Sequence, residues 1–181
     1  MNLRTFIAID IPDSIKNEIT KIQNFLPEFT GKKTERENLH LTLKFLGEID
    51  EEKIELIKEK LREIKIKKFE TIIDKIGFFD NRSSNVYSRN IIVWLHLTNC
   101  AELQKQVDKF LEGLFQTEKR FMSHMTIARV KKIKDKTSFI KDLESIKFPE
   151  IRFMVKNFKL KKSVLKPKSP KYEDLETYNL I

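Results

Sequence analysis

One four-residue motif, or phrase, occurs twice in this sequence, each time inside an apolar run of strand length. It reads HLTL from His40 and HMTI from His124. In a β-strand, side chains at positions i and i+2 point to the same face, and the residues between them point to the other. Each run therefore predicts a strand whose His and Thr share one face while its apolar residues enter a core.

The elements predicted around this phrase also repeat. Hydrophobic periodicity predicts a strand, an amphipathic helix, the strand with the phrase, a second helix and a further strand. This order occurs over about residues 3–78 and again over about 90–165, with a polar loop or hairpin at 77–90 and a final strand at about 170–181. We therefore expect an internal duplication within a single α+β domain that spans residues 1–181. Its two pseudo-symmetric lobes, each an antiparallel sheet with outer helices, should face each other across a central groove.

The expected boundaries follow from the same patterns. Strands are predicted at 3–9, 40–46, 69–76, 91–97, 122–130, 151–165 and 172–180, and helices at 13–26, 51–64, from Asn99 to 114, and 136–146. Asn99 is expected to cap the third helix, because Glu102 three residues later completes a capping box. Residues 27–39, which include Lys32 and Lys33, are expected to form a loop.

The third histidine fits the same pattern, since His96 is followed by Leu97 and Thr98. We interpret it as structural or merely exposed, because Thr98 adjoins the predicted helix cap. In the repeat, moreover, its strand corresponds to the N-terminal strand and not to the strand with the phrase.

Charge indicates the class of partner. Lys and Arg number 36 against 27 Asp and Glu, a net charge of +9 that suits a polyanion such as a nucleic acid. A Lys- and Glu-rich surface is also typical of proteins from hot-growing organisms. A single cysteine, no signal-peptide pattern and no apolar run of about 18 residues predict a cytoplasmic protein that has no membrane partner. We expect it to be a monomer.

The histidine and threonine of the repeated motif are suited to one kind of chemistry. An unperturbed imidazole has a pKa of about 6.5, so a pair of them supplies both a base and an acid near neutrality. Threonine hydroxyls can donate hydrogen bonds to phosphate oxygens and stabilise the charge that develops there. Two such strands facing across a groove would therefore suit acid–base chemistry at a phosphate, although the residues do not decide which histidine is the acid.

With these residues the chain resembles the RNA 2′,3′-cyclic phosphodiesterases of the 2′–5′ RNA ligase type, within the two-histidine (2H) phosphoesterase superfamily. The resemblance covers nearly the whole length. It is carried by LRTFIAIDIP at the start, ENLHLTLKFLGEI around His40, RFMSHMTIARVKK around His124 and FKLKKSVLKPKSPKYEDLETYNL at the end. One departure is visible, because the family commonly has proline just before the second histidine and this chain has Ser123.

The resemblance implies hydrolysis of a 2′,3′-cyclic phosphate at an RNA end to a 2′-phosphate, with no metal and no cofactor. It implies catalytic roles for His40 and His124 and phosphate binding by Thr42 and Thr126. Two alternatives stay open. One is a 2′–5′ RNA ligase or 2′–5′ phosphodiesterase that uses the same site, and the other is a non-catalytic module that binds RNA or a nucleotide.

Other residues are weaker candidates. Arg129 is a candidate phosphate clamp, because guanidinium groups pair well with phosphate oxygens, but strict alternation places it on the face opposite His124 unless the strand bulges. Phe45 and Phe121 could stack on a base, although each is more typical of a core. The lysines that could line an RNA path are Lys131, Lys132, Lys134, Lys156, Lys159, Lys161, Lys162, Lys166 and Lys168.

Overall fold

The computed structural model describes residues 2–82, 89–167 and 169–181. Its helices are α1 (Asp13–Asn24), α2 (Glu51–Arg62), α3 (Ala101–Phe110) and α4 (Lys136–Ser145), with a 3₁₀ turn η1 at Arg36–Asn38. Its strands are β1 (Leu3–Asp10), β2 (Thr30–Lys33), β3 (His40–Ile49), β4 (Phe69–Arg82), β5 (Arg89–Leu97), β6 (His124–Lys132), β7 (Ile151–Val155), β8 (Asn157–Val164) and β9 (Lys171–Asn179).

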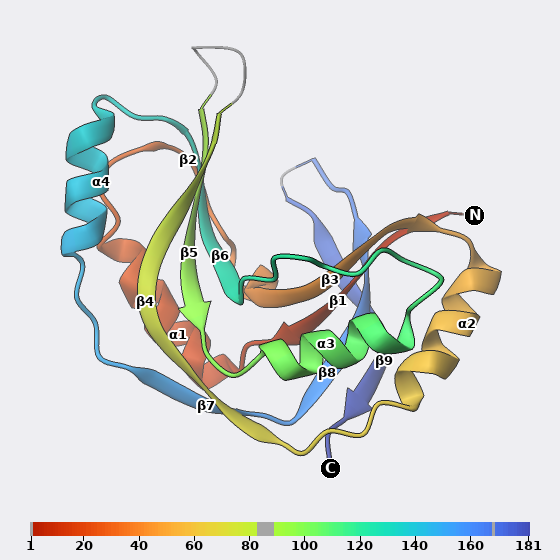
Figure 1. Cartoon of the computed structure of the whole chain (residues 1–181). Helices are drawn as coiled ribbons and strands as arrows, with labels where there is room; N and C mark the ends of the chain where they lie inside the picture. The colour runs from red at the N-terminus through yellow and green to blue at the C-terminus, as the bar shows by residue number, and fades with distance from the viewer. Residues whose placement is uncertain (1, 83–88, 168) are drawn as a thin grey trace.

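All nine strands belong to one antiparallel sheet in the order β7-β4-β5-β6-β3-β1-β8-β9, and β2 pairs with β6 outside this path. The sheet curls so that β4, β5 and β6 stand on one side and β1, β3, β8 and β9 on the other (Figure 1). The expected α+β class with two lobes is confirmed, and the lobes are the two halves of this curled sheet.

The two halves of the sheet meet at the strands that carry the repeated phrase. One residue pair, Leu41 with Met125, joins β3 to β6. Both side chains are fully buried. Beyond this pair the two strands diverge, and β2 pairs with the edge of β6 from Lys132 to Ala128. The divergence opens the groove between the lobes.

Each lobe contains strands from both halves of the sequence. β4 pairs with β5, the first strand of the second predicted repeat, and β8 pairs with β1, the first strand of the first repeat. The prediction of one strand over 151–165 is therefore wrong. The chain breaks at Lys156, because β7 pairs with β4 in one lobe and β8 pairs with β1 in the other.

Other boundaries also differ from the sequence prediction. Residues 30–33 form the strand β2 and not a loop, and β4 continues through residues 77–82, which were expected to be a loop. The expected loop also included residues 89 and 90, which begin β5, and residues 83–88, which lie outside the described residues. Asn99 does not cap α3, because it has a φ of 63° and its side chain donates to the carbonyl of Glu70.

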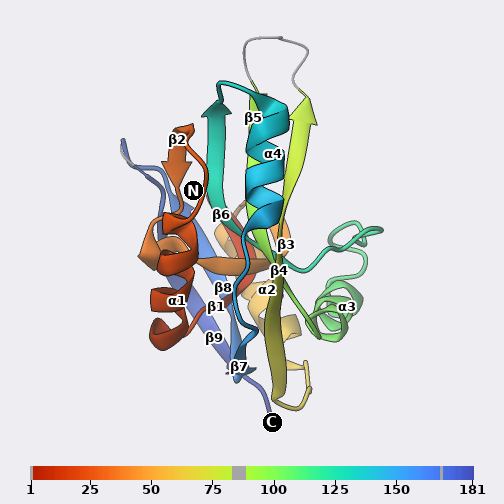
Figure 2. The same ribbon diagram turned by 90° about the vertical axis from the view of Figure 1, so that its left-hand side faces the viewer.

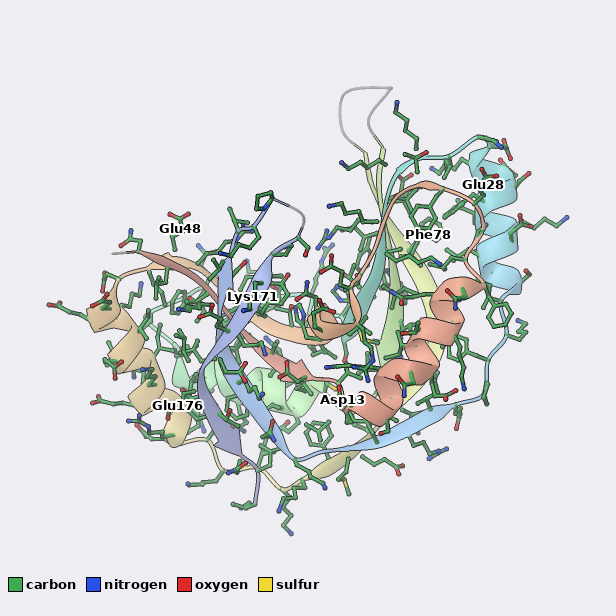
Figure 3. All side chains as sticks on the ribbon, turned by 180° about the vertical axis from the view of Figure 1, so that it is seen from behind. Asp13, Glu28, Glu48, Phe78, Lys171 and Glu176 are labelled. Carbon is green, nitrogen blue, oxygen red and sulfur yellow. The ribbon has the colours of Figure 1, made fainter. Side chains whose placement is uncertain are left out.

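The helices cover the outside of the curled sheet. α4 packs against β4, α1 against β6 and β7, and α3 against β3 (Figure 2). α2 is tied to β9 by a bidentate ion pair in which Arg62 donates to Glu176 at 2.6 and 2.9 Å. Figure 3 shows the reverse side, where α1 begins at Asp13 and β9 runs from Lys171 past Glu176. Among the described residues no helix is both long enough and apolar enough to cross a bilayer.

Candidate active site

A groove of about 410 Å³ lies between the two lobes and is lined by both copies of the repeated phrase. His40, Thr42, His124, Thr126 and Arg129, which are all the site residues expected from the sequence, contribute to its wall. The remaining lining residues are Lys32, Lys33, Thr34, Glu35, Asn38, Phe45, Ile92, Ser169, Pro170 and Tyr172.

The pairing of β3 with β6 explains why the two copies face each other. Leu41 and Met125 pair and point into the core, so the residues on either side of each point into the groove. Because the strands are antiparallel, His40 lies across from Thr126 and Thr42 lies across from His124. The two imidazoles thus occupy opposite ends of a pseudo-two-fold arrangement with a hydroxyl beside each.

Both imidazoles are held by backbone carbonyls in the same way. The Nδ1 atom of His40 lies 2.7 Å from the carbonyl oxygen of Asn38, and Nδ1 of His124 lies 2.7 Å from that of Met122. A carbonyl oxygen only accepts, so each Nδ1 carries the proton and donates it. Each Nε2 is therefore the nitrogen left to exchange a proton with a ligand in the groove.

Burial changes the acidity of both imidazoles. It lowers the pKa of His40 to about 4, with Lys161 and Arg129 adding to the effect and the Asn38 carbonyl opposing it. Burial also lowers the pKa of His124, again with a contribution from Arg129. Both rings are therefore neutral at pH 7 in the free protein.

Aromatic side chains hold each imidazole in place. His40 packs against Phe6 and edge-on against Tyr172, with ring centroids 5.0 and 5.1 Å away. His124 packs edge-on against Phe79 at 5.0 Å, and Trp94 lies 6.5 Å away. The Trp94 ring covers Gly77, where an added Cβ would lie only 2.3 Å from the ring. Glycine at this position therefore leaves room for the Trp94 ring to pack on β4 near His124.

A bulge brings Arg129 to the groove face. On β5, Trp94 pairs with Thr126 and the neighbouring Val93 pairs with Ala128, which leaves Ile127 as an extra residue on β6. An extra residue reverses the alternation beyond it, so Arg129 shares the face of His124 and Thr126. The bulge that the sequence interpretation required is present.

The carbonyl of Ile127 is fixed from outside its own strand. It accepts a hydrogen bond from the backbone N–H of Thr34 at 2.8 Å and another from Nε2 of Gln23 at 2.9 Å. The same Nε2 donates to the carbonyl of Thr34 at 2.9 Å. Gln23 is a buried residue of α1, so a helix of the first half of the chain fastens the bulge in the second motif strand.

The first motif strand has a bulge at the matching place. On β1, Ile7 pairs with Lys44 and Ala8 pairs with Thr42, so Leu43 is the extra residue. Phe45 consequently points into the groove and is 73% exposed at its rim. It stands at the position that Arg129 occupies in the other strand.

An ion pair supports this first bulge from behind. Lys44 and Asp108 of α3 are each only 6% exposed and form a salt bridge. Lys44 also donates to the carbonyl of Gln116 at 2.7 Å, and Asp108 accepts from the backbone N–H of Glu118 at 2.9 Å. Although burial opposes it, the Lys44 ammonium and these donors lower the pKa of Asp108.

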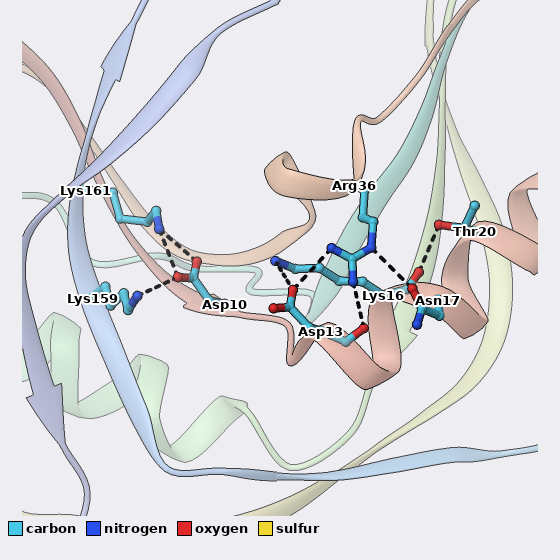
Figure 4. A network of polar contacts seen from close by, with 8 residues as sticks. All are labelled: Asp10, Asp13, Lys16, Asn17, Thr20, Arg36, Lys159 and Lys161. Carbon is cyan, nitrogen blue, oxygen red and sulfur yellow. Dashed lines mark hydrogen bonds and ion pairs between the residues drawn. The ribbon is translucent and has the colours of Figure 1, made fainter.

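Four charges lie beside His40 on the neighbouring strands. Asp10, the partner of His40 on β1, accepts from Lys161 at 2.9 and 3.0 Å and forms an ion pair with Lys159 at 2.8 Å (Figure 4). Asp174 on β9 binds both lysines at 2.6 Å. The positive and negative charges balance, so this cluster does not by itself attract a polyanion.

Several lysines proposed for an RNA path are engaged elsewhere. Lys159 and Lys161 belong to this cluster, Lys162 pairs with Glu173, and Lys134 pairs with Glu28. Lys168 lies outside the described residues. The groove is instead lined by Lys32 and Lys33, which sequence reasoning assigned to a loop. Tyr172 was also missed, because nothing in the local sequence indicates that its ring packs against His40.

The remaining candidates lie away from the groove. Phe121 lines a different cavity, beside α3. His96 pairs with His124 across β5 and β6, but its Nδ1 is 2.7 Å from a carboxylate oxygen of Asp74, and it does not line the groove. Within the described part of the chain, no three His, Cys, Asp or Glu side chains converge as metal ligands would.

Known proteins are similar to this chain in sequence and in fold. The model of the family described as LigT like Phosphoesterase matches residues 9–87 and 97–172. The RNA 2′,3′-cyclic phosphodiesterase of Methanocaldococcus jannaschii is 39% identical and covers 97% of this chain and 100% of its own length. That of Archaeoglobus fulgidus is 35% identical and covers 97% and 99%. The crystal structure of E. coli LigT with 3′-AMP superposes with a TM-score of 0.78 at 24% identity, covering 99% of each chain.

Proposed function

The chain belongs to the LigT-like phosphoesterase family, and from that premise we propose that it is an RNA 2′,3′-cyclic phosphodiesterase. Curated relatives that match it over nearly their full length bear this name. The observation that supports the proposal most directly is the groove itself. Two imidazoles with fixed Nδ1 protons, two hydroxyls and a guanidinium line one cavity of nucleotide size.

The chemistry follows from these groups. A 2′,3′-cyclic phosphate is strained and carries one negative charge, and opening it to a 2′-phosphate requires water to attack phosphorus in line with the departing 3′ oxygen. The Nε2 of one imidazole takes a proton from that water, while Nε2–H of the other gives a proton to the 3′ oxygen. The two histidines are suited to this because they lie at opposite ends of the motif pair.

The other groove residues act on the non-bridging phosphate oxygens. The hydroxyls of Thr42 and Thr126 donate to these oxygens, and Arg129 binds them through its planar fork of N–H groups. Their attraction is strongest when charge accumulates in the transition state, so they accelerate the reaction as well as bind the substrate. Burial lowers the pKa of both histidines, and Arg129 adds to the effect, which is expected of a cation on the same groove wall.

The test uses an oligoribonucleotide that ends in a 2′,3′-cyclic phosphate, with excess EDTA. The wild-type protein should release a 2′-phosphate product, and His40→Ala and His124→Ala should each lower kcat by at least about 100-fold, since each removes one proton-transfer group. His96→Ala is the matched control, because it removes an imidazole outside the groove. No turnover by wild type, or turnover that survives both groove mutations, would sink the proposal and favour a binding module.

We infer a monomer that acts in the cytoplasm, which is supported by the single buried cysteine and by a groove completed within one chain. Gel filtration should give a mass near 21.6 kDa. Elution at twice this mass would contradict the monomer.

A further inference from the structure

The segment that precedes His40 is a single short turn outside the sheet. Residues Arg36–Asn38 form the 3₁₀ turn η1, and the last of them, Asn38, supplies the carbonyl that accepts the Nδ1 proton of His40. A 3₁₀ turn contains few hydrogen bonds and these are poorly aligned, so it does not fix its own position. The side chains that anchor the turn therefore determine where this carbonyl lies.

The start of the turn is anchored on α1. The guanidinium of Arg36 donates to the carbonyl of Asp13 at 3.1 Å and to the amide oxygen of Asn17 at 3.3 Å (Figure 4). It also forms an ion pair with the Asp13 carboxylate at 3.3 Å. All three residues are exposed, so these contacts contribute little to holding the turn in place.

The end of the turn is anchored by the side chain of Asn38, a residue that is only 9% exposed. Its Nδ2 donates to the carbonyl of Pro170 at 3.0 Å and to the carboxylate of Glu35 at 3.5 Å. Removing the amide would leave a partly buried carbonyl without this donor, which costs more than losing an exposed contact. One residue thus joins the carbonyl that holds His40 to the segment that leads into β9.

The contact with Pro170 also bears on a second side of the imidazole. Tyr172 lies two residues after Pro170 and packs edge-on against His40, with the ring centroids 5.1 Å apart. Asn38 therefore acts on His40 in two ways, through its own carbonyl at Nδ1 and through the strand that carries Tyr172. Both Pro170 and Tyr172 line the groove, so the amide ties this part of the wall to the proton-transfer group.

The second motif histidine is held by a different arrangement. Met122, whose carbonyl holds His124, is followed by Ser123, and the carbonyl of Ser123 accepts from the backbone N–H of Leu97 at 3.2 Å. The backbone before this histidine is thus fixed by a main-chain hydrogen bond to β5. His124 therefore serves as an internal reference for any change made at Asn38.

We propose that Asn38 is a positioning residue for His40, whose side-chain amide keeps the imidazole in the Nδ1–H tautomer with Nε2 directed into the groove. The tautomer matters because free histidine favours Nε2–H, and a protonated Nε2 on a neutral ring cannot accept a proton from water. The inference rests on the proposed function for its kinetic consequence, whereas its structural consequence is independent of turnover.

The first test observes the tautomers directly. The chain has three histidines, so their ring ¹⁵N signals in a long-range ¹H–¹⁵N spectrum can be assigned with single His→Ala variants. At about pH 8, where the rings are neutral, both groove histidines of wild type should show the Nδ1–H pattern. In Asn38→Leu, which keeps a similar volume but has no donor, His40 should become a mixture of tautomers while His124 stays unchanged.

The second test measures turnover of the dinucleotide ApA ending in a 2′,3′-cyclic phosphate. Asn38→Leu should lower kcat about tenfold, as is usual when a partly buried hydrogen bond is lost. It should change KM by less than about twofold, because the phosphate-binding hydroxyls are untouched. In a His40→Ala background the same substitution should have no further effect, because a positioning residue acts only through the residue that it positions.

Thr71→Val is the matched control. Thr71 is fully buried and its hydroxyl donates to the carbonyl of Thr98 at 2.7 Å, but it does not line the groove. This variant therefore also loses a side-chain contact with a backbone carbonyl, and its tautomers and kcat should stay as in wild type. If Asn38→Leu does not fold, Asn38→Ser replaces it in both tests, because a serine hydroxyl is too short to reach Pro170.

Several outcomes would overturn the positioning role. They are an Nε2–H tautomer of His40 in wild type, an unchanged His40 tautomer in Asn38→Leu, an equal change at His124 or in Thr71→Val, and a loss of kcat that multiplies with that of His40→Ala. If wild type turns over no cyclic phosphate, the proposed function fails. The tautomers of wild type and Asn38→Leu then still decide whether Asn38 positions His40.

Discussion

In the free protein at pH 7 each motif histidine is neutral, and its hydrogen bond to the backbone determines which ring nitrogen can exchange a proton with a ligand. The backbone carbonyls of Asn38 and Met122 hold the Nδ1 protons, so only Nε2 changes its protonation during a reaction. Burial lowers the pKa of both rings, to about 4 for His40. The fraction of enzyme with one ring protonated and the other neutral is therefore largest in mildly acidic solution.

We expect a bell-shaped pH profile of kcat/KM with its maximum below pH 6.5, the ordinary pKa of imidazole. The rate rises as the base loses its proton and falls as the acid loses its proton, and a lowered pKa moves both limbs to lower pH. Rates for a dinucleotide 2′,3′-cyclic phosphate between about pH 4 and 9 test this. In Asp10→Asn the acidic limb should move lower still, because the Asp10 charge raises the pKa of His40. A maximum on the alkaline side of 6.5 would contradict the expectation.

The motif residues could be predicted from sequence because a strand has a period of two, which needs no knowledge of distant residues. His40, Thr42, His124 and Thr126 all line the groove as expected. The face of Arg129 could not be predicted in this way. It depends on a bulge whose carbonyl is bound by Gln23, a residue 104 positions away from Ile127.

Each motif strand is supported by a helix from the other half of the chain. α1, from the first half of the chain, fastens the bulge of β6 through Gln23, and α3, from the second half, supports the bulge of β3 through Asp108. These bulges decide whether Arg129 and Phe45 face the groove. The helices on the outside of the sheet therefore contribute to the geometry of the groove on its inside.

We expect Gln23→Met to lower kcat/KM about tenfold, because it removes the amide that fixes the Ile127 carbonyl but keeps a similar volume. If Gln23 acts by positioning Arg129, the double variant Gln23→Met/Arg129→Ala should be no slower than Arg129→Ala alone. Ile19→Val on the same buried face of α1 controls for a loss of stability. Losses that multiply in the double variant, or a matching loss in Ile19→Val, would show a merely structural role.

Some elements were missed because their partners are distant in sequence. The break at Lys156 has no local signal, since residues 151–164 read as one alternating run, and only the separate partners β4 and β1 divide it. β2 contains Gly31 and two lysines, a poor strand composition, and forms because the free edge of β6 is available. Asn99 matches a cap but instead binds the Glu70 carbonyl.

The exchange of strands makes the two lobes one cooperative unit. β4 and β8 each leave their own predicted repeat to pair in the other lobe, and the buried core is continuous across both. Damage to one lobe should therefore destabilise the other by the same amount. Trp94 is a convenient reporter, because it is the single tryptophan and lies on β5.

We expect Lys44→Met to lower the free energy of unfolding by about 3 kcal/mol, because it leaves Asp108 buried without its partner. Although Lys44 is in the other lobe, the urea midpoints from Trp94 fluorescence and from circular dichroism should shift together. The control Lys44→Met/Asp108→Leu, which removes both charges, should recover most of the loss. Two separate transitions, with the Trp94 midpoint unmoved, would contradict the single unit.

The exchange of strands between the lobes also bears on how this fold evolved. If the halves arose by duplication, as we propose from their common element order, a half-length ancestor would have lacked the neighbours that β4 and β8 now find in the opposite lobe. Two copies could have met that need by donating their terminal strands to each other. Fusion would then have made the exchange permanent and allowed the copies to diverge. On this proposal, the difference between Arg129 and Phe45, at matching places after the two bulges, is a result of that divergence, which gave one copy a charge and the other an aromatic surface.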